Sequence, residues 1–266
     1  MAKVERAVLE SALRARRLDR TLTATHLTGP GREAQGGRVP TGVAALDRLL
    51  HGGLPGGALS ELAGSRSSGC TMLLLQVLAE TTRRGGLAAL VDTCDRLDLS
   101  SAVEAGIELD RLLWIRGQPI TRTAALTDAH GTPGGPGAAR APGLLERAID
   151  RGVKACALVL QAGGFGVVAL DLSDVAPAAL GRLPFTTWLR LQRLLEGSET
   201  AGLLVAPAPL ARSADGVSLV LQGQASWRDG TGPQQLVGLE TTIRIVSPRR
   251  TVQGEVALRA QFDRRP

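Results

Sequence analysis

The chain has 266 residues, 44% of them apolar and 2% aromatic, which predicts a sizeable aliphatic core in one large domain or in a domain with a small appendage. The formal charge is +6, and the basic side chains concentrate at the two ends of the chain around a near-neutral middle. No apolar run reaches the roughly 18 residues that a membrane span needs, so composition excludes a membrane-spanning protein and no membrane contact is predicted.

The first predicted element is an amphipathic helix over residues 2–22, followed by a Thr/Gly/Pro-rich linker that runs to residue 37. We therefore divide the chain into an N-terminal helix with its linker, residues 1–37, and a core, residues 38–266. The helix either docks on a neighbouring molecule or packs back on its own core, and the sequence leaves both open. Its polar side carries four arginines: Arg14, Arg16, Arg17 and Arg20.

The core begins with strands and helices in alternation, an order that predicts a parallel sheet with crossover helices. The segments, in chain order, are a helix that ends near Leu50, a strand Ala58–Ala63, a Gly-rich loop Gly64–Gly69, a helix Cys70–Arg84, a strand Leu87–Val91 followed by Asp92, a helix Ser100–Ala105 and a strand Leu112–Ile115.

Residues 117–143, rich in Gly and Pro, interrupt this alternation, and we predict a mobile surface insertion there. The segments that follow are a short helix Leu144–Arg151, an apolar run Val153–Ala162 that favours helix over strand, a buried strand Gly166–Asp171, a helix Pro184–Leu195 and a strand Leu203–Ala206. Three further strand-like runs fill residues 217–262. The predicted fold class is therefore α/β: a mostly parallel sheet flanked by helices, with an antiparallel β extension at residues 217–262.

The stretch Gly52–Thr71, GGLPGGALSELAGSRSSGCT, carries the strongest chemical signal. It meets the phosphate-loop pattern G-x-x-x-x-G-K-[ST] at both glycines and at the final Thr, but Cys70 stands where the pattern has lysine. In such a loop backbone N–H groups and a helix N-terminus hold phosphate, and an acid at the end of a later strand supports Mg²⁺. The resulting candidate site is a degenerate nucleotide loop: Gly64, Ser65, Arg66, Ser67, Ser68, Gly69, Cys70 and Thr71, with Asp171 as the strand-end acid.

Loss of the lysine removes a charge-assisted contact of about 1.5–3 kcal/mol in binding and more in the transition state. We therefore expect no required cofactor and no catalytic residue, although weak binding of ATP with Mg²⁺ stays open. Cys70 and Cys94 either fill an emptied pocket or form a redox pair at the strand ends. The histidines and cysteines lack metal-ligand spacing, so no metal site is predicted.

Residues 38–116 resemble the core of the RecA recombinase family, on the stretches PTGVAALDRLLHGGLPGGALSELAGSRSSGCT and ALVDTCDRLDLSSAVEAGIELDRLLW. Further stretches, LQAGGFG, PFTTWLRLQRLLEG and LLVAPAPLA, are similar to the ImuA proteins of bacterial SOS mutagenesis cassettes. On this resemblance Cys94 aligns with the family's catalytic Glu, and Pro207 or Ala208 with the Gln that couples γ-phosphate to DNA. The two DNA-binding loops would be Ser173–Gly181 and Ala206–Gly216, both short.

The resemblance implies a catalytically degenerate RecA-like adaptor in SOS-induced, error-prone translesion synthesis. It implies RecA, an ImuB-type Y-family-like polymerase and an error-prone replicative-type polymerase as partners, with modulation of RecA filaments. Sparse cysteines and no recognisable targeting segment suggest the cytoplasm, and the resemblance adds the nucleoid. An alternative is a DNA-stimulated ATPase that uses Arg66 in place of lysine and Asp95 as base; a third is an ATP-binding scaffold without turnover. Candidate DNA or partner contacts are the four N-terminal arginines with Arg249, Arg250, Arg264 and Arg265.

Overall fold

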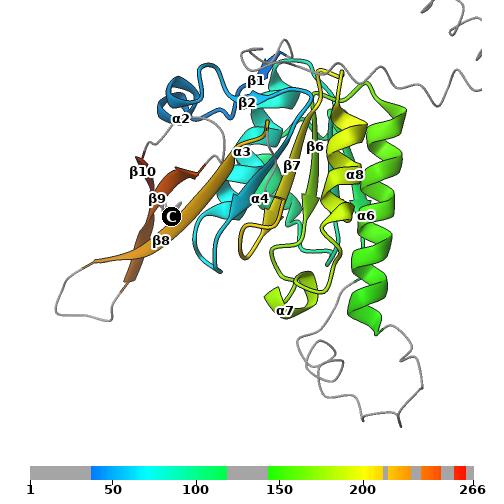
Figure 1. Cartoon of the computed structure of the whole chain (residues 1–266). Helices are drawn as coiled ribbons and strands as arrows, with labels where there is room; N and C mark the ends of the chain where they lie inside the picture. The colour runs from blue at the N-terminus through cyan, green and yellow to red at the C-terminus, as the bar shows by residue number, and fades with distance from the viewer. Residues whose placement is uncertain (1–36, 119–142, 212–214, 229–234, 247–254, 262–266) are drawn as a thin grey trace, which may run out of the picture. The chain divides into compact units, whose positions relative to one another are not determined.

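The computed structural model describes residues 37–118, 143–211, 215–228, 235–246 and 255–261 (Figure 1). The predicted N-terminal helix and its four arginines lie outside these residues, as do Arg249, Arg250, Arg264 and Arg265 and most of the predicted insertion. Those predictions therefore stay predictions. The described residues fold as the α/β class that the sequence predicts.

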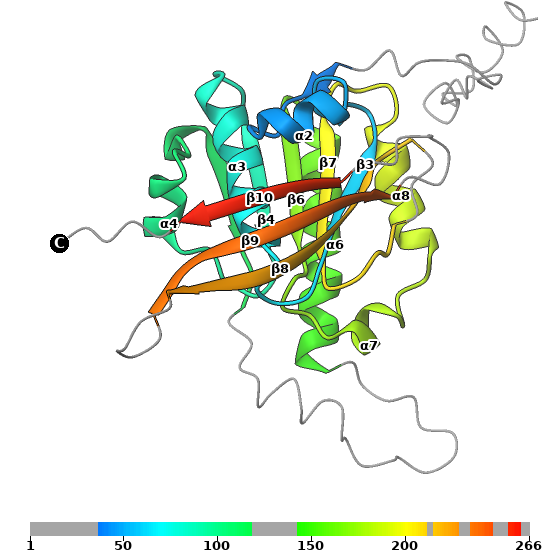
Figure 2. The ribbon, with the colours of Figure 1, turned by 90° about the vertical axis from the view of Figure 1, so that its left-hand side faces the viewer.

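An eight-stranded sheet forms the centre of the fold, in the order β10-β9-β8-β3-β7-β6-β4-β5 (Figures 1 and 2). The strands from β8 to β5 pair in parallel, whereas β9 and β10 add to β8 in antiparallel. The mostly parallel sheet with an antiparallel extension is thus confirmed. The strands are β3 (Leu59–Ala63), β4 (Ala88–Asp92), β5 (Leu112–Arg116), β6 (Val167–Asp171), β7 (Ala201–Ala206), β8 (Ser218–Arg228), β9 (Gln235–Val246) and β10 (Glu255–Gln261). A separate small sheet pairs β1 (Arg38–Val39) with β2 (Leu54–Pro55).

Helices cover both faces of the parallel part. The run Ala88–Val91 explains why, because its alternate residues enter two different apolar cores. One core packs under α3, and the other under α6 and α8, which lie side by side in Figure 1. The helices are α2 (Ala44–Leu49), α3 (Cys70–Arg83), α4 (Leu99–Glu104), the 3₁₀ turn η2 (Leu109–Arg111), α6 (Leu144–Ala162), α7 (Pro177–Leu180) and α8 (Thr186–Leu195).

One predicted boundary is wrong. The sequence predicts a short helix to Arg151 and a separate segment from Val153, whereas α6 is a single helix of 19 residues. Gly152 inside the apolar pattern suggests a break, since Gly weakens a helix interior. In the structure Gly152 is buried, and a Cβ there would lie 2.8 Å from Thr93 Oγ1. The glycine therefore permits close packing of α6 against the end of β4.

Candidate functional site

The phosphate-like loop joins β3 to α3 at the carboxyl edge of the parallel strands. Gly69 precedes α3 with a left-handed φ of 94°, a conformation that favours glycine. A Cβ at Gly69 would lie 2.6 Å from Thr241 Oγ1 of β9. Strand β8 is equally close, because a Cβ at Gly223 would lie 2.1 Å from Ser67 O. The antiparallel extension thus supports the loop from behind.

A cavity of about 990 Å³ opens in front of this loop. It brings together all nine residues of the predicted degenerate nucleotide loop, because Gly64 through Thr71 and Asp171 line it. Residues of α3 and α4, among them Gln76 and Ser101, and of the loops after β4 and β6 line much of the remaining wall. The cavity therefore brings together residues from two distant segments of the chain, and their role as a nucleotide site stays a prediction.

Cys70 supplies no charge to the cavity. Its side chain is buried, and Ser68 Oγ lies 3.2 Å from its Sγ in a hydrogen bond. Burial raises the pKa of the Cys70 thiol, nearby Asp171 raises it further, and the contact with Ser68 lowers it. The position that the phosphate-loop pattern gives to a lysine thus holds a neutral thiol at physiological pH.

Cys94 is also buried, just beyond β4, and does not line the cavity. Burial raises its pKa to about 11, helped by the negative charges of Asp171 and Asp174. All three cysteines, the third being Cys156, are free thiols. Thiolate is the form that exchanges with disulfides, so the high pKa weighs against the redox-pair alternative, which stays a prediction.

The high thiol pKa gives a measurable result. We expect Cys94 to react slowly with iodoacetamide at pH 8, because almost all of it is protonated there, and to react faster as the pH approaches 11. The rate at Cys94 is followed by peptide mass spectrometry after the folded chain is labelled and the reaction is quenched, which separates Cys94 from Cys70 and Cys156. The same residue in urea-unfolded chain is the control, and it should react at the ordinary rate of an exposed cysteine. Equal rates in both states at pH 8 would show that the thiol is not shielded.

Two carboxylates, half-buried Asp171 and buried Asp92, close the carboxyl edge. Asp171 ends β6, accepts a hydrogen bond from Ser173 N at 2.8 Å, and has a pKa raised by burial. Asp92 ends β4 and accepts hydrogen bonds from the backbone N–H groups of Arg96 and Leu97 and from Trp114 Nε1. Asp92 is therefore a structural acceptor that fixes the loop after β4.

Sequence reasoning missed the ion pairs that cross this edge. Asp174 Oδ1 lies 2.5 Å from Arg66 Nη2, and its Oδ2 lies 3.0 Å from Arg96 Nε. All three residues line the cavity. The sequence did hold a signal for the contact between Asp174 and Arg96. Asp174 lies three residues after the Asp that ends β6, Arg96 lies four residues after the Asp that ends β4, and these two strands are parallel neighbours. Arg66, named as the lysine substitute, is therefore engaged with a carboxylate.

Asp95, the base of the ATPase alternative, has another role in the structure. Arg116 Nε and Nη2 donate to its two carboxylate oxygens at 2.8 and 2.9 Å, and this contact lowers the pKa of Asp95. The Arg116 guanidinium also lies over the Trp114 ring, 4.6 Å from its centroid. A paired carboxylate of low pKa is a poor general base. The geometry therefore does not favour the role assigned to Asp95.

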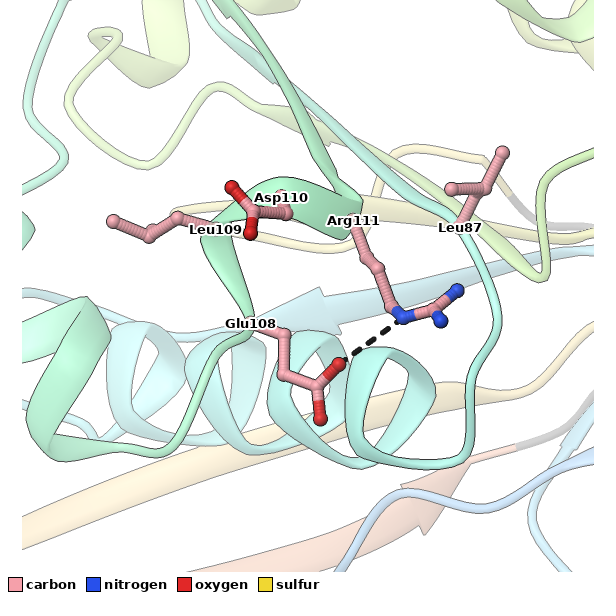
Figure 3. A pocket seen from close by; sticks show the side chains of 5 residues that line it. All are labelled: Leu87, Glu108, Leu109, Asp110 and Arg111. Carbon is pink, nitrogen blue, oxygen red and sulfur yellow. Dashed lines mark hydrogen bonds and ion pairs between the residues drawn. The ribbon is translucent and has the colours of Figure 1, made fainter.

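A second cavity, of about 620 Å³, lies at the start of β5 (Figure 3). Arg111 crosses it, donating to Glu108 Oε2 at 3.1 Å and to Gly85 O at 2.7 Å. Leu87, Leu109 and Asp110 complete the lining. None of the predicted site residues is among them, so we assign this cavity no role.

Across the described ranges, no three His, Cys, Asp or Glu side chains are grouped so as to hold a metal ion. In the same part of the chain, no helix combines the length and apolarity needed to cross a bilayer.

Known proteins match part of this chain. Residues 17–130 match the model of the RecA N-terminal domain. Protein RecA of Synechococcus elongatus is 43% identical over 88 residues, 33% of this chain and 24% of that protein. Protein RecA of Prochlorococcus marinus (strain MIT 9303) is 45% identical over 87 residues, 33% of this chain and 22% of that protein. Protein RecA of Thermus thermophilus is 38% identical over 127 residues, 47% of this chain and 37% of that protein.

These alignments span between 22% and 37% of the relatives' own length. The part of the chain that matches the domain model includes the Gly-rich loop, α3, β4 and β5. Strands β6 and β7 continue the same parallel sheet beyond that match. The chain is therefore similar to RecA over residues 17–130, and its α/β fold is consistent with a RecA-like fold.

Proposed function

We propose that this chain is a RecA-like adaptor without ATP turnover that acts in SOS-induced, error-prone translesion DNA synthesis, as its resemblance to ImuA proteins implies. Its partners are RecA, an ImuB-type Y-family-like polymerase and an error-prone replicative-type polymerase. RecA-like filaments repeat one heterologous interface between subunits. A protein that presents one side of this interface but does not hydrolyse ATP can therefore cap or modulate such a filament. Arginines outside the described residues are the proposed contacts for DNA or partners.

The observation that carries the proposal is that buried Cys70, which accepts a hydrogen bond from Ser68, occupies the lysine position of the phosphate-like loop. Cys94, which aligns with the family's catalytic Glu, is a second protonated thiol. A phosphoryl-transfer site needs positive charge at the phosphates and a group that orients the attacking water. Neither cysteine supplies these, which supports an adaptor over an enzyme. Weak binding of ATP with Mg²⁺ remains part of the proposal, as a property without turnover.

The alternative, a DNA-stimulated ATPase, needs a free Arg66 and a basic Asp95. Arg66 contacts Asp174, and Asp95 contacts Arg116. Since both residues are already engaged, the described contacts support the adaptor more than the ATPase. A measurement of ATP hydrolysis distinguishes the two functions. The ATPase alternative requires hydrolysis, and it requires that substitution of Arg66 or Asp171 abolishes this hydrolysis.

The adaptor role is tested by association with RecA. Deleting residues 1–28 is expected to abolish capture of RecA in a pull-down, because that segment carries the proposed docking helix and its basic side chains. A second variant keeps the segment but replaces its four arginines with Gln, which separates the charge from the apolar side of the helix. Capture that is unchanged by the deletion would contradict the proposed docking element. Failure of the intact chain to capture RecA would contradict the partner.

A further inference from the structure

Asp174 lies where three loops meet. Its two carboxylate oxygens contact Arg66 from the loop after β3 and Arg96 from the loop after β4, while Asp174 itself follows β6. Arg66 and Asp174 are separated by 108 positions in sequence. One carboxylate thus joins the carboxyl ends of three parallel strands across the mouth of the phosphate-like loop.

Among the residues that the structure describes, Arg66 and Arg96 are the cations in the lining of the cavity. Both contact the same carboxylate, and Arg66 belongs to the loop whose backbone would face a phosphate. The lining also carries acidic Asp98, Glu104 and Asp171. An incoming polyphosphate would therefore meet more acids than bases, with both arginines already engaged by Asp174.

Arg96 is held in place through its backbone. Its N–H donates to both oxygens of buried Asp92, at 2.9 and 2.8 Å. On the other side, the N–H of Ser173 donates to Asp171 at the end of β6, which fixes the chain just before Asp174. The contact between Arg96 and Asp174 is therefore anchored on two neighbouring strands.

We propose that Asp174 acts as an internal ligand of the phosphate-like loop. Its carboxylate stands in for an external phosphate, satisfies Arg66 and Arg96, and joins the three loops without nucleotide. The inference concerns regulation of the phosphate-like loop. It rests on the proposed function in one respect, which is that the chain binds its partners without nucleotide. Two consequences follow. The native chain binds polyphosphate anions weakly, and removing the carboxylate ends its contacts with Arg66 and Arg96, which lets these arginines bind such anions.

The contact is also one that an anion can replace. The Arg66 side chain is 63% exposed and the Arg96 side chain 48% exposed, and exposed ion pairs add little to stability. Substitution of Asp174 should therefore leave the fold intact. The affinity for an added anion therefore reports whether Asp174 competes with that anion for the two arginines.

The test is isothermal titration of the full chain with inorganic pyrophosphate. Asp174→Asn is expected to bind pyrophosphate about tenfold more tightly than the native chain, a ratio that corresponds to about 1.4 kcal/mol. Adding Arg96→Gln to Asp174→Asn should remove the gain. The matched control is Asp95→Asn, which makes the same change in net charge at a carboxylate that contacts Arg116 outside the cavity. That control should bind pyrophosphate as the native chain does.

Two results would overturn the proposal. One is equal affinity in Asp174→Asn and the native chain; the other is an equal gain in Asp95→Asn, which would indicate only a general effect of charge. Thermal unfolding of each variant checks that the fold is kept. No partner is present in this titration, so its failure is distinct from failure of the RecA pull-down, and either proposal can fall while the other stands.

Discussion

Replacing Glu61 with Ala is expected to lower the free energy of unfolding by roughly 3 kcal/mol, because two backbone donors would lose their acceptor. Glu61 lies in the middle of β3 and is 2% exposed. Its Oε2 accepts hydrogen bonds from the N–H groups of Leu210 and Ala211, at 2.8 and 2.9 Å, and Ser218 Oγ donates to Oε1. One side chain thus holds the segment between β7 and β8 against the strand before the phosphate-like loop.

The measurement is urea unfolding followed by circular dichroism, with hydrogen exchange of the two amides as a local readout. Ser60→Ala is the matched control at the neighbouring position, where a single N–H, that of Val217, donates to the hydroxyl at 3.1 Å. It should cost about 1 kcal/mol, the usual value of one hydrogen bond. If Glu61→Ala costs no more than this control, the carboxylate does not hold the segment.

Replacing Cys70 with Lys is expected to tighten binding of ATP with Mg²⁺ by at least about tenfold, since a charge-assisted hydrogen bond is worth about 1.5–3 kcal/mol. Cys70 begins α3 and lines the cavity, so a longer side chain has space to extend toward a bound phosphate. Hydrolysis should remain absent, because Cys94 offers no carboxylate to orient water. The measurement is equilibrium binding of a fluorescent ATP analogue together with phosphate release.

Cys70→Ala is the control for this gain, since it removes the thiol without adding charge. It should bind the analogue as the native chain does. A lysine variant that binds no better than Cys70→Ala would show that the missing charge is not what weakens this loop.

The sequence predicted the parallel core because its signals are local. The runs Ala88–Asp92 and Val167–Asp171 are short, apolar and end in carboxylates, as strands buried on both faces do. The phosphate-loop spacing likewise placed Gly64 through Thr71 between a strand and a helix, and Asp171, the one acid that the sequence assigns to the site, lines the same cavity. Each of these features depends on neighbours in sequence or on the parallel order of strands.

What could not be predicted depends on contacts between distant residues. The sequence predicts two segments on either side of Gly152, in line with the low helix propensity of glycine. In the structure α6 is continuous, because close packing of Gly152 against Thr93 outweighs that propensity. Nothing local marks Asp174 as the partner of Arg66, since the pair is joined only when β3 and β6 lie in one sheet. The roles given to Arg66 and Asp95 in the ATPase alternative rested on charge alone, without knowledge of what each side chain contacts.

Phosphate release from ATP tests most directly whether this chain lacks turnover. The assay uses the purified chain with Mg²⁺, with and without single-stranded DNA, beside a reaction without protein. We expect release at the background rate in both conditions, even where the fluorescent analogue binds weakly. Saturable, DNA-stimulated release that disappears in Asp171→Asn would contradict the adaptor and favour an ATPase.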